Sequence, residues 1–352
     1  MRAADPDAAW GVKTHKTGRD EAYFGYELHA VVRVGPLGGP PNGTPCVAER
    51  IVVRPASTNA TADVLAALHR MQDADLRVRD VIADRGYSYK VDWTPGLIAL
   101  GLDPVHDLHA NQYGARGTHA GARIITAVPH CPAMPTPLDD IRRPERLAAG
   151  PELERFKTAI AEREHWALRR IALPDPTDKE RYECPARVGK IKCPLHKPSL
   201  KLGVELPTVT DPPPDPDNLA CCSQRTITVP GTVDAKARQR HYWGSAEWIG
   251  AFSRRSRVEG WFGNLKSENT EALGRGAFRV MGIAKTTIML GIYSAATNMR
   301  LLRTWAKRTN DTDELTDLIV PIHTSVPAGI DLVTGELGRP PPDGTNSDRR
   351  LH

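Results

Sequence analysis

The sequence has few aromatic residues, few cysteines and no long uninterrupted apolar segment. Aromatic residues make up 6% of the 352 residues, and there are six cysteines. The longest apolar region, 280–299, is interrupted by Lys285, so we expect no membrane span, which needs about 18 apolar residues. The first residues, MRAADPDAAWG, lack the apolar segment of a secretory signal. We therefore expect a cytoplasmic protein whose cysteines are reduced thiols or metal ligands rather than disulfides.

Acidic residues are scarce in one segment near the carboxyl end. The whole chain has a formal net charge of +5. Between residues 251 and 308 there are eleven Lys or Arg and three acids, one of which is Glu259. A basic segment around a single acid suits an anionic partner such as the phosphate backbone of a nucleic acid. The length predicts about two domains, and 40% hydrophobic residues are enough for a folded core.

The first third of the chain has the pattern of an α/β protein. Residues 26–34 and 46–54 are rich in Val and Ile and predict strands. A helix is predicted over 61–71 and a short strand over 78–83. Residues 98–107 predict the end of a helix, a Gly and a further strand. Strand, helix and strand in this order indicate a crossover unit.

The remaining pattern divides the chain further. In 111–240 the periodicity is weak and Pro and Gly are frequent, apart from a charged helix at 151–168 and a loop at 210–218. Helical signals resume near 245, and a long helix is expected over 277–309. Its apolar stripe consists of Met281, Ala284, Ile288, Ile292, Ala295, Met299 and Leu302. The predicted organisation is a core of two parts, 20–110 and 241–310, an insertion subdomain at 111–240, and a poorly ordered tail at 311–352.

Two acids stand out as candidates for chemistry. In FSRRSRVEGWFGNLK, the residues Phe252, Arg255, Glu259 and Lys266 are three, four and seven apart, which places them on one face of a helix. A carboxylate between bases suits a divalent cation held beside a phosphate. Asp84 follows an apolar stretch, where a strand end points into the ligand crevice of an α/β sheet. The alternative interpretation of Asp84 is a turn residue without a chemical role.

These motifs resemble those of the large DDE-type insertion-sequence transposases with a Tyr-Arg-Glu-Lys signature, with Phe252 in place of the Tyr. IADRGYSY, which contains Asp84, is similar to the second-acid motif of that family. FGYELHAVV resembles its Gly-Tyr-x-Leu-His strand, and PASTNATAD resembles its segment before the first helix. AFRVMGIAKTTIMLGIYSAATNMRLL resembles the long helix that follows the catalytic Glu. The resemblance covers roughly 20–110 and 240–310.

The resemblance implies a ribonuclease H-like fold, a mixed sheet flanked by helices. It implies that Asp84 and Glu259 are catalytic and bind two Mg²⁺ or Mn²⁺ ions. Arg255 and Lys266 would hold DNA phosphate. The implied activity is metal-dependent DNA cleavage and strand transfer. The implied partners are transposon ends and target DNA, bound by a homodimer or larger complex in the nucleoid.

The first acid of the family's triad has no clear counterpart. Asp5, Asp7 and Asp20 are the acids available before Tyr26, and none follows an apolar strand. We therefore expect an amino-terminally truncated chain with an incomplete triad and with absent or very weak strand transfer. Two alternatives remain: a non-catalytic DNA-binding remnant, and a ribonuclease H-like nuclease that is not a transposase.

Cysteines in the insertion offer a separate hypothesis. Cys184, Cys193, His196 and Cys221 would together provide the four ligands of a tetrahedral structural zinc site. The alternative is a set of ordinary buried thiols. Similarly, Trp243, Trp248 and Trp261 near the Glu helix are expected in the core, with stacking on DNA bases as the alternative.

Overall fold

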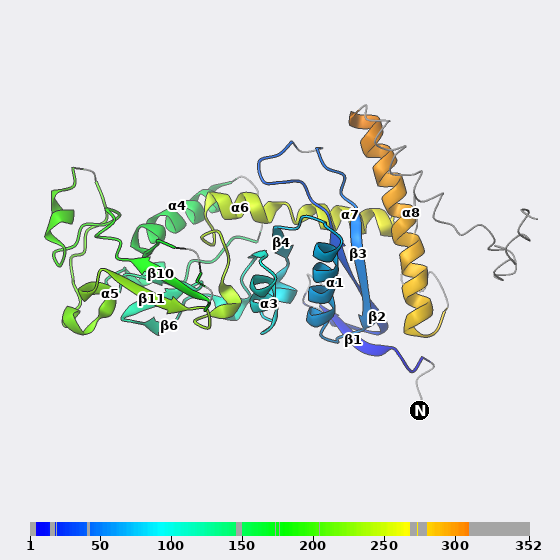
Figure 1. Ribbon diagram of the computed structural model, residues 1–352, viewed down its shortest axis with the longest axis horizontal. Helices are drawn as coiled ribbons and strands as arrows, with labels where there is room; N and C mark the ends of the chain where they lie inside the picture. The colour runs from blue at the N-terminus through cyan, green and yellow to red at the C-terminus, as the bar shows by residue number, and fades with distance from the viewer. Residues whose placement is uncertain are drawn as a thin grey trace, which may run out of the picture.

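The computed structural model describes residues 5–14, 18, 20–40, 43–145, 150–172, 174–175, 177–203, 205–267, 273 and 280–309. The molecule is elongated, with most of the predicted insertion at one end and the long carboxyl-proximal helix at the other (Figure 1). The predicted tail, 311–352, lies outside the described residues. The fold is mixed α/β, as predicted.

An antiparallel sheet forms the amino-terminal part. Its strands are β1 (Ala9–Thr14), β2 (Asp20–Val32) and β3 (Ala48–Pro55). β1 pairs with the first half of β2, and β3 pairs with the second half, with Tyr26 opposite Pro55. β2 and β3 confirm two predicted strands. A further strand, β1, precedes Tyr26, and it is held by pairing and not by burial: its Trp10 is 68% exposed.

The segment after β3 confirms the helix predicted over 61–71 and the strand predicted over 78–83. It contains α1 (Thr61–Asp73), β4 (Asp80–Ala83), α2 (Arg85–Ser88), α3 (Trp93–Ala99) and β5 (Asp103–His106). The parallel crossover joins β4 to β5 and not β3 to β4, since β3 and β4 lie in separate sheets. β4 and β5 are parallel, with Ala83 opposite His106. Buried apolar side chains of α1 and α3, Leu68 and Leu97 among them, pack in one core cluster beside β4. The carboxyl ends of β4 and β5 therefore lie side by side.

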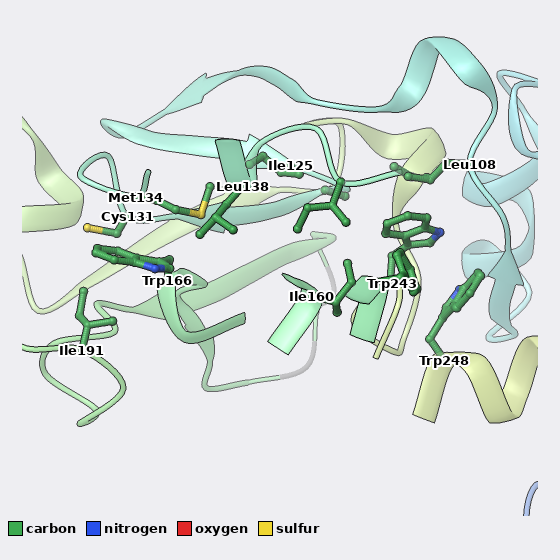
Figure 2. Close-up of a cluster of buried hydrophobic side chains, with 14 of the residues drawn as sticks. Leu108, Ile125, Cys131, Met134, Leu138, Ile160, Trp166, Ile191, Trp243 and Trp248 are labelled. Carbon is green, nitrogen blue, oxygen red and sulfur yellow. The ribbon is translucent and has the colours of Figure 1, made fainter. Parts of the chain in front are cut away.

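The insertion is more regular than its sequence indicates. It holds the antiparallel sheet β6 (Ala115–His119), β7 (Ala122–Ile125) and β8 (Val128–His130), and then α4 (Pro151–Trp166), which confirms the predicted charged helix. A second sheet has the order β11-β10-β9, with β9 (Arg169–Arg170), β10 (Lys179–Glu183) and β11 (Thr226–Pro230), and α5 (Ala220–Ser223) precedes β11. Trp166 and Ile160 lie in the same core as Trp243 and Trp248, so this core includes residues beyond 240 (Figure 2).

The helix expected through Phe252 and Glu259 is two helices. They are α6 (Ala246–Ser253) and α7 (Ser256–Lys266). In the first turn of α7 the amides of Arg257 and Val258 donate to carbonyls three residues back, which tightens the turn. Phe252 therefore ends one helix and Glu259 lies in the next, so the four signature residues do not share one uninterrupted helix. Figure 1 shows α6 and α7 running from the insertion to the last helix.

The long helix α8 (Ile283–Thr309) lies at the end of the molecule beside β3 (Figure 1). The apolar stripe noted in the sequence does not face the sheet, since its Met281, Ile288 and Ile292 are 60%, 64% and 59% exposed. The buried side chains of α8 are Thr286, Leu290, Ser294, Thr297 and Ala306. Small residues on this face allow a close approach to the sheet. No helix in the described part of the chain is both long and apolar enough to cross a bilayer.

Candidate functional site

A cavity of about 870 Å³ separates the two strand groups of the amino-terminal part. Its lining includes consecutive residues of β2 and β4, apolar side chains of α1 and one face of α7. Asp84 and Glu259, which are 175 residues apart in the sequence, both line it, and so does Arg255. The structure thus brings together the two acids and one of the two bases selected from the sequence.

The two strands that flank the cavity run in opposite directions. At one end, Arg254 donates to the carbonyl of Gly35, just after β2, and to Asp80 at the start of β4 (3.3 and 2.6 Å). At the other end, the hydroxyl of Tyr87, just after β4, lies 2.7 Å from Nδ1 of His29 within β2. Among the described strands, β4 pairs only with β5, and the second half of β2 pairs only with β3. Each strand therefore has an unpaired edge at the cavity.

Asp84 begins helix α2 directly after β4. Its Oδ1 accepts a hydrogen bond from the amide of Gly86 at 2.9 Å, as an N-cap does. A Cβ on residue 86 would lie 2.9 Å from this same oxygen, so the Gly permits the close approach. The Asp84 side chain is exposed at the cavity. Capping and ligand binding are compatible, because one carboxylate accepts several hydrogen bonds or cations.

Glu259 and Arg255 form an ion pair within the helical turn. Their Oε1 and Nη1 atoms are 2.8 Å apart, and Glu259 is 62% exposed. The guanidinium of Arg255 also lies over the Phe252 ring, with 5.6 Å between its Cζ and the ring centroid. Phe252 itself is buried and stacks on Trp248. The Phe252 ring therefore positions Arg255, and Arg255 partly neutralises Glu259.

Lys266 lies farther along α7 and does not line the cavity. It is exposed, with its Nζ 5.6 Å from the ring centroid of Phe262, a cavity residue. Trp261 on the other side of this helix is buried, as are Trp243 and Trp248, which confirms all three as core residues. The exposed cations of α7 extend from the cavity toward the carboxyl end of the helix.

His29 and Tyr87 were not selected as site residues from the sequence. His29 is partly buried against Tyr87, and burial lowers the pKa of its imidazole despite opposing effects of Glu27 and Asp84. Burial raises the pKa of Tyr87, and the charge of Asp84 raises it further. Both side chains line the cavity beside Asp84. The FGYELH and DRGY motifs contained them, but motif position alone gave no indication of their contact.

Two of the acids considered for the missing position have structural roles. Asp5 Oδ2 accepts from the amide of Gly282 at 3.0 Å and from the hydroxyl of Tyr26 at 2.8 Å. Asp7 Oδ2 accepts from the amide of Ile283 at 3.0 Å. Both acids therefore cap the amino end of α8, where a negative charge is favourable. The amide of Gly282 lowers the pKa of Asp5.

The described residues do not complete a divalent cation site. No group of three or more His, Cys, Asp or Glu side chains among them has metal-binding spacing. Asp84 and Glu259 supply two carboxylates, and Glu259 is paired with Arg255. Two carboxylates fit part of the expected Mg²⁺ or Mn²⁺ site.

The predicted zinc ligands separate into two groups. Cys184, Cys193 and His196 line a small cavity in the insertion. Cys221 does not line it and packs with Ile227 and Val229 in another apolar cluster. Cys131 and Cys222, which were not predicted, line the cavity in addition. The proposed ligand set therefore needs correction, because backbone direction in α5 turns Cys222 and not Cys221 to this space.

The cavity between β2, β4 and α7 is thus the candidate site for chemistry, and the cysteine cavity lies in the insertion. We compared the chain with protein-family profiles, with curated proteins and with solved structures, and none of the three comparisons gave a match.

Proposed function

We propose that this chain is the ribonuclease H-like part of a DDE-type insertion-sequence transposase, and that it binds DNA at the cavity between β2, β4 and α7. The main support is that Asp84 and Glu259 line one cavity although 175 residues separate them. Asp84 follows a strand of a parallel pair, where α/β proteins bind ligands. Mg²⁺ or Mn²⁺ is the cation that these two carboxylates would help to hold.

The half-buried Arg255 at the start of α7 and the exposed Lys266 at its end provide the DNA contacts in this proposal. Arg255 lies at the cavity, and Lys266 lies farther along the same helix. Guanidinium and ammonium groups bind phosphate oxygens, and each contact releases counterions, so the affinity falls with salt concentration. DNA phosphate would compete with Glu259 for Arg255, since the ion pair within α7 occupies this guanidinium.

Binding without cleavage is the form of this function that the geometry favours. Four carboxylates line the cavity, those of Glu49, Asp80, Asp84 and Glu259, and all of them except Asp84 are in an ion pair with an arginine in the described structure. A transposase remnant that binds DNA without cleaving it would need only the basic side chains of Arg255 and Lys266. A ribonuclease H-like nuclease that is not a transposase remains the other candidate, and preference for one DNA end sequence distinguishes the two.

Fluorescence anisotropy with a labelled DNA duplex tests the proposal. We expect binding at low salt that weakens as salt increases. Arg255→Ala and Lys266→Ala should each weaken binding several-fold and reduce the salt slope by about one. Lys157→Ala, on the exposed face of α4, is the matched control and should change neither quantity. Absence of binding, or equal effects of all three substitutions, would contradict the proposal.

A nicking assay with supercoiled plasmid DNA tests whether the catalytic site is incomplete. With Mg²⁺ or Mn²⁺ we expect no nicking above that of the Asp84→Asn variant. Metal-dependent nicking that Asp84→Asn and Glu259→Gln both abolish would instead show a complete catalytic site. Sedimentation of the chain with and without DNA would test the expected homodimer.

A further inference from the structure

Four cysteines from separate segments of the insertion converge on one small cavity. Cys131 follows β8, Cys184 follows β10, Cys193 lies in the next loop and Cys222 lies in α5. All four line a cavity of about 20 Å³. A space of this size holds about one water molecule or one ion, and it is too small for an iron–sulfur cluster. Figure 2 shows Cys131 beside Trp166 at the end of the core.

Three of these cysteines lie in turns of the same construction. Cys131, Cys184 and Cys193 each precede a proline. In each turn the amide three residues later donates to the carbonyl of the cysteine, at 3.1, 3.0 and 3.0 Å. Proline fixes the backbone angle of the second turn position, so the three turns are preset by the sequence.

Backbone amides in these turns also point at the sulfur atoms. Burial raises the pKa of Cys131, Cys184 and Cys193, and hydrogen bonds from the amides of Ala133 to Cys131, of Ala186 and Arg187 to Cys184, and of Leu195 and His196 to Cys193 oppose this rise. Thiolates are the form that binds a soft or borderline metal ion.

Disulfide bonding does not account for the cluster. All six cysteines are free, and the sulfur atoms of Cys221 and Cys222 are 3.8 Å apart. The side chains stand wider than in a metal-loaded site, since the described residues show no group at metal-binding spacing. Metal binding would draw the four sulfur atoms to about 2.3 Å from the ion.

We propose that Cys131, Cys184, Cys193 and Cys222 form a structural zinc site that fastens β8, the loops after β10 and helix α5 together. Four thiolates and a single-ion cavity suit tetrahedral Zn²⁺. This proposal does not depend on the function proposed for the other cavity, because the two sites share no residue.

Metal analysis of the protein purified without chelator is the first test. We expect one zinc per chain. Cys222→Ser should lose the zinc, whereas Cys221→Ser, the neighbouring residue in α5, should keep it, and Cys46→Ser should keep it too. Equal loss in Cys221→Ser and Cys222→Ser, bound iron in place of zinc, or no zinc in the unaltered chain would overturn the proposal.

Cobalt substitution covers the case in which Cys222→Ser does not fold. Co²⁺ added to the metal-free chain should give the strong near-ultraviolet absorption of thiolate ligands. Cys222→His retains a fourth ligand, so it should still bind Co²⁺ with a weaker thiolate band. Absence of this band in the unaltered chain, or an identical band in Cys222→His, would contradict ligation by Cys222.

Discussion

Asp84 and Asp107 follow the ends of two paired parallel strands, and only Asp84 faces the cavity. Ala83 and His106, the residues before them, are opposite each other in the ladder. Asp107 is 1% exposed, and its Oδ2 lies 2.8 Å from both Arg85 and Arg143. The Asp107 carboxylate is therefore a buried anchor for two guanidinium groups and not a third ligand at the site.

Substitution of this anchor should be costly to stability. Asp107→Ala leaves Arg143 buried without its partner, and we expect a loss of about 3–5 kcal/mol in the free energy of unfolding. Arg85 is 48% exposed, so Arg85→Ala should cost about 1 kcal/mol or less. Urea denaturation of the three proteins measures both values. If Arg85→Ala lost as much stability as Asp107→Ala, the exposed pair with Arg85, and not the buried pair with Arg143, would account for the stabilising effect of Asp107.

Removal of the charge of Glu259 should strengthen DNA binding. Glu259→Gln releases Arg255 from its ion pair and removes a negative charge near the proposed phosphate position. We expect a several-fold lower Kd for duplex DNA at low salt, and a steeper salt dependence. Glu154→Gln, which breaks a similar surface pair with Lys157 on α4, is the control. Tighter binding by both variants would point to net charge alone.

Stability should depend on pH through the buried His130. Burial lowers the pKa of His130 to about 3 from its ordinary value of 6.5. The unfolded chain therefore binds a proton that the folded chain does not between these two pH values. Stability from this group is complete above pH 6.5 and is lost as the pH falls toward 3, at about 1.4 kcal/mol per pH unit.

A comparison with His130→Gln isolates this effect. The variant is expected to be less stable at pH 7.5, because His130 bonds both Val128 and Tyr242. Its stability should change less than that of the unaltered chain between pH 6.5 and pH 4. Parallel curves of Tm against pH for the two proteins would show that His130 does not carry this dependence.

Asn298 should be essential for the docking of α8 on β3. Its Oδ1 accepts from the amide of Ala48 at 2.9 Å and from the indole of Trp261 at 3.0 Å. Its Nδ2 donates to the carbonyl of Ala48 at 2.9 Å. Asn298→Ala leaves these groups without partners, so we expect a loss of about 2–3 kcal/mol. Thr304→Ala, on the same helix with only a local bond, should cost less than half as much in urea denaturation.

Local sequence patterns predicted those parts of the site that depend only on residues close together in the sequence. The apolar stretch before Asp84 and the helical spacing around Glu259 are both local, and the structure contains the corresponding strand and helix. Their meeting at one cavity followed only from the resemblance. The buried state of Asp107 depends on Arg143, which is 36 residues away in the sequence, and no local pattern indicates this contact.

Two further differences between the sequence predictions and the structure are caused by tertiary contacts. The apolar stripe of α8 is exposed because the helix docks through small residues and through Asn298, whose amide replaces a strand partner for Ala48. The cysteines were assigned from nearby spacing, which favoured Cys221 and missed Cys131. Cys131 and Cys222 are 91 residues apart and meet only because β8 and α5 fold toward the same small cavity.

The facing edges of β2 and β4 leave the hydrogen-bond ladder of the sheet interrupted. In the described part of the chain, their backbones are connected across the cavity through side chains such as Arg254, Tyr87 and His29. Any extended polypeptide that entered between the two strands would run antiparallel to one and parallel to the other. It would add N–H and C=O partners on both of its sides at once. The two strand edges beside the cavity are therefore both open to backbone pairing with an added strand.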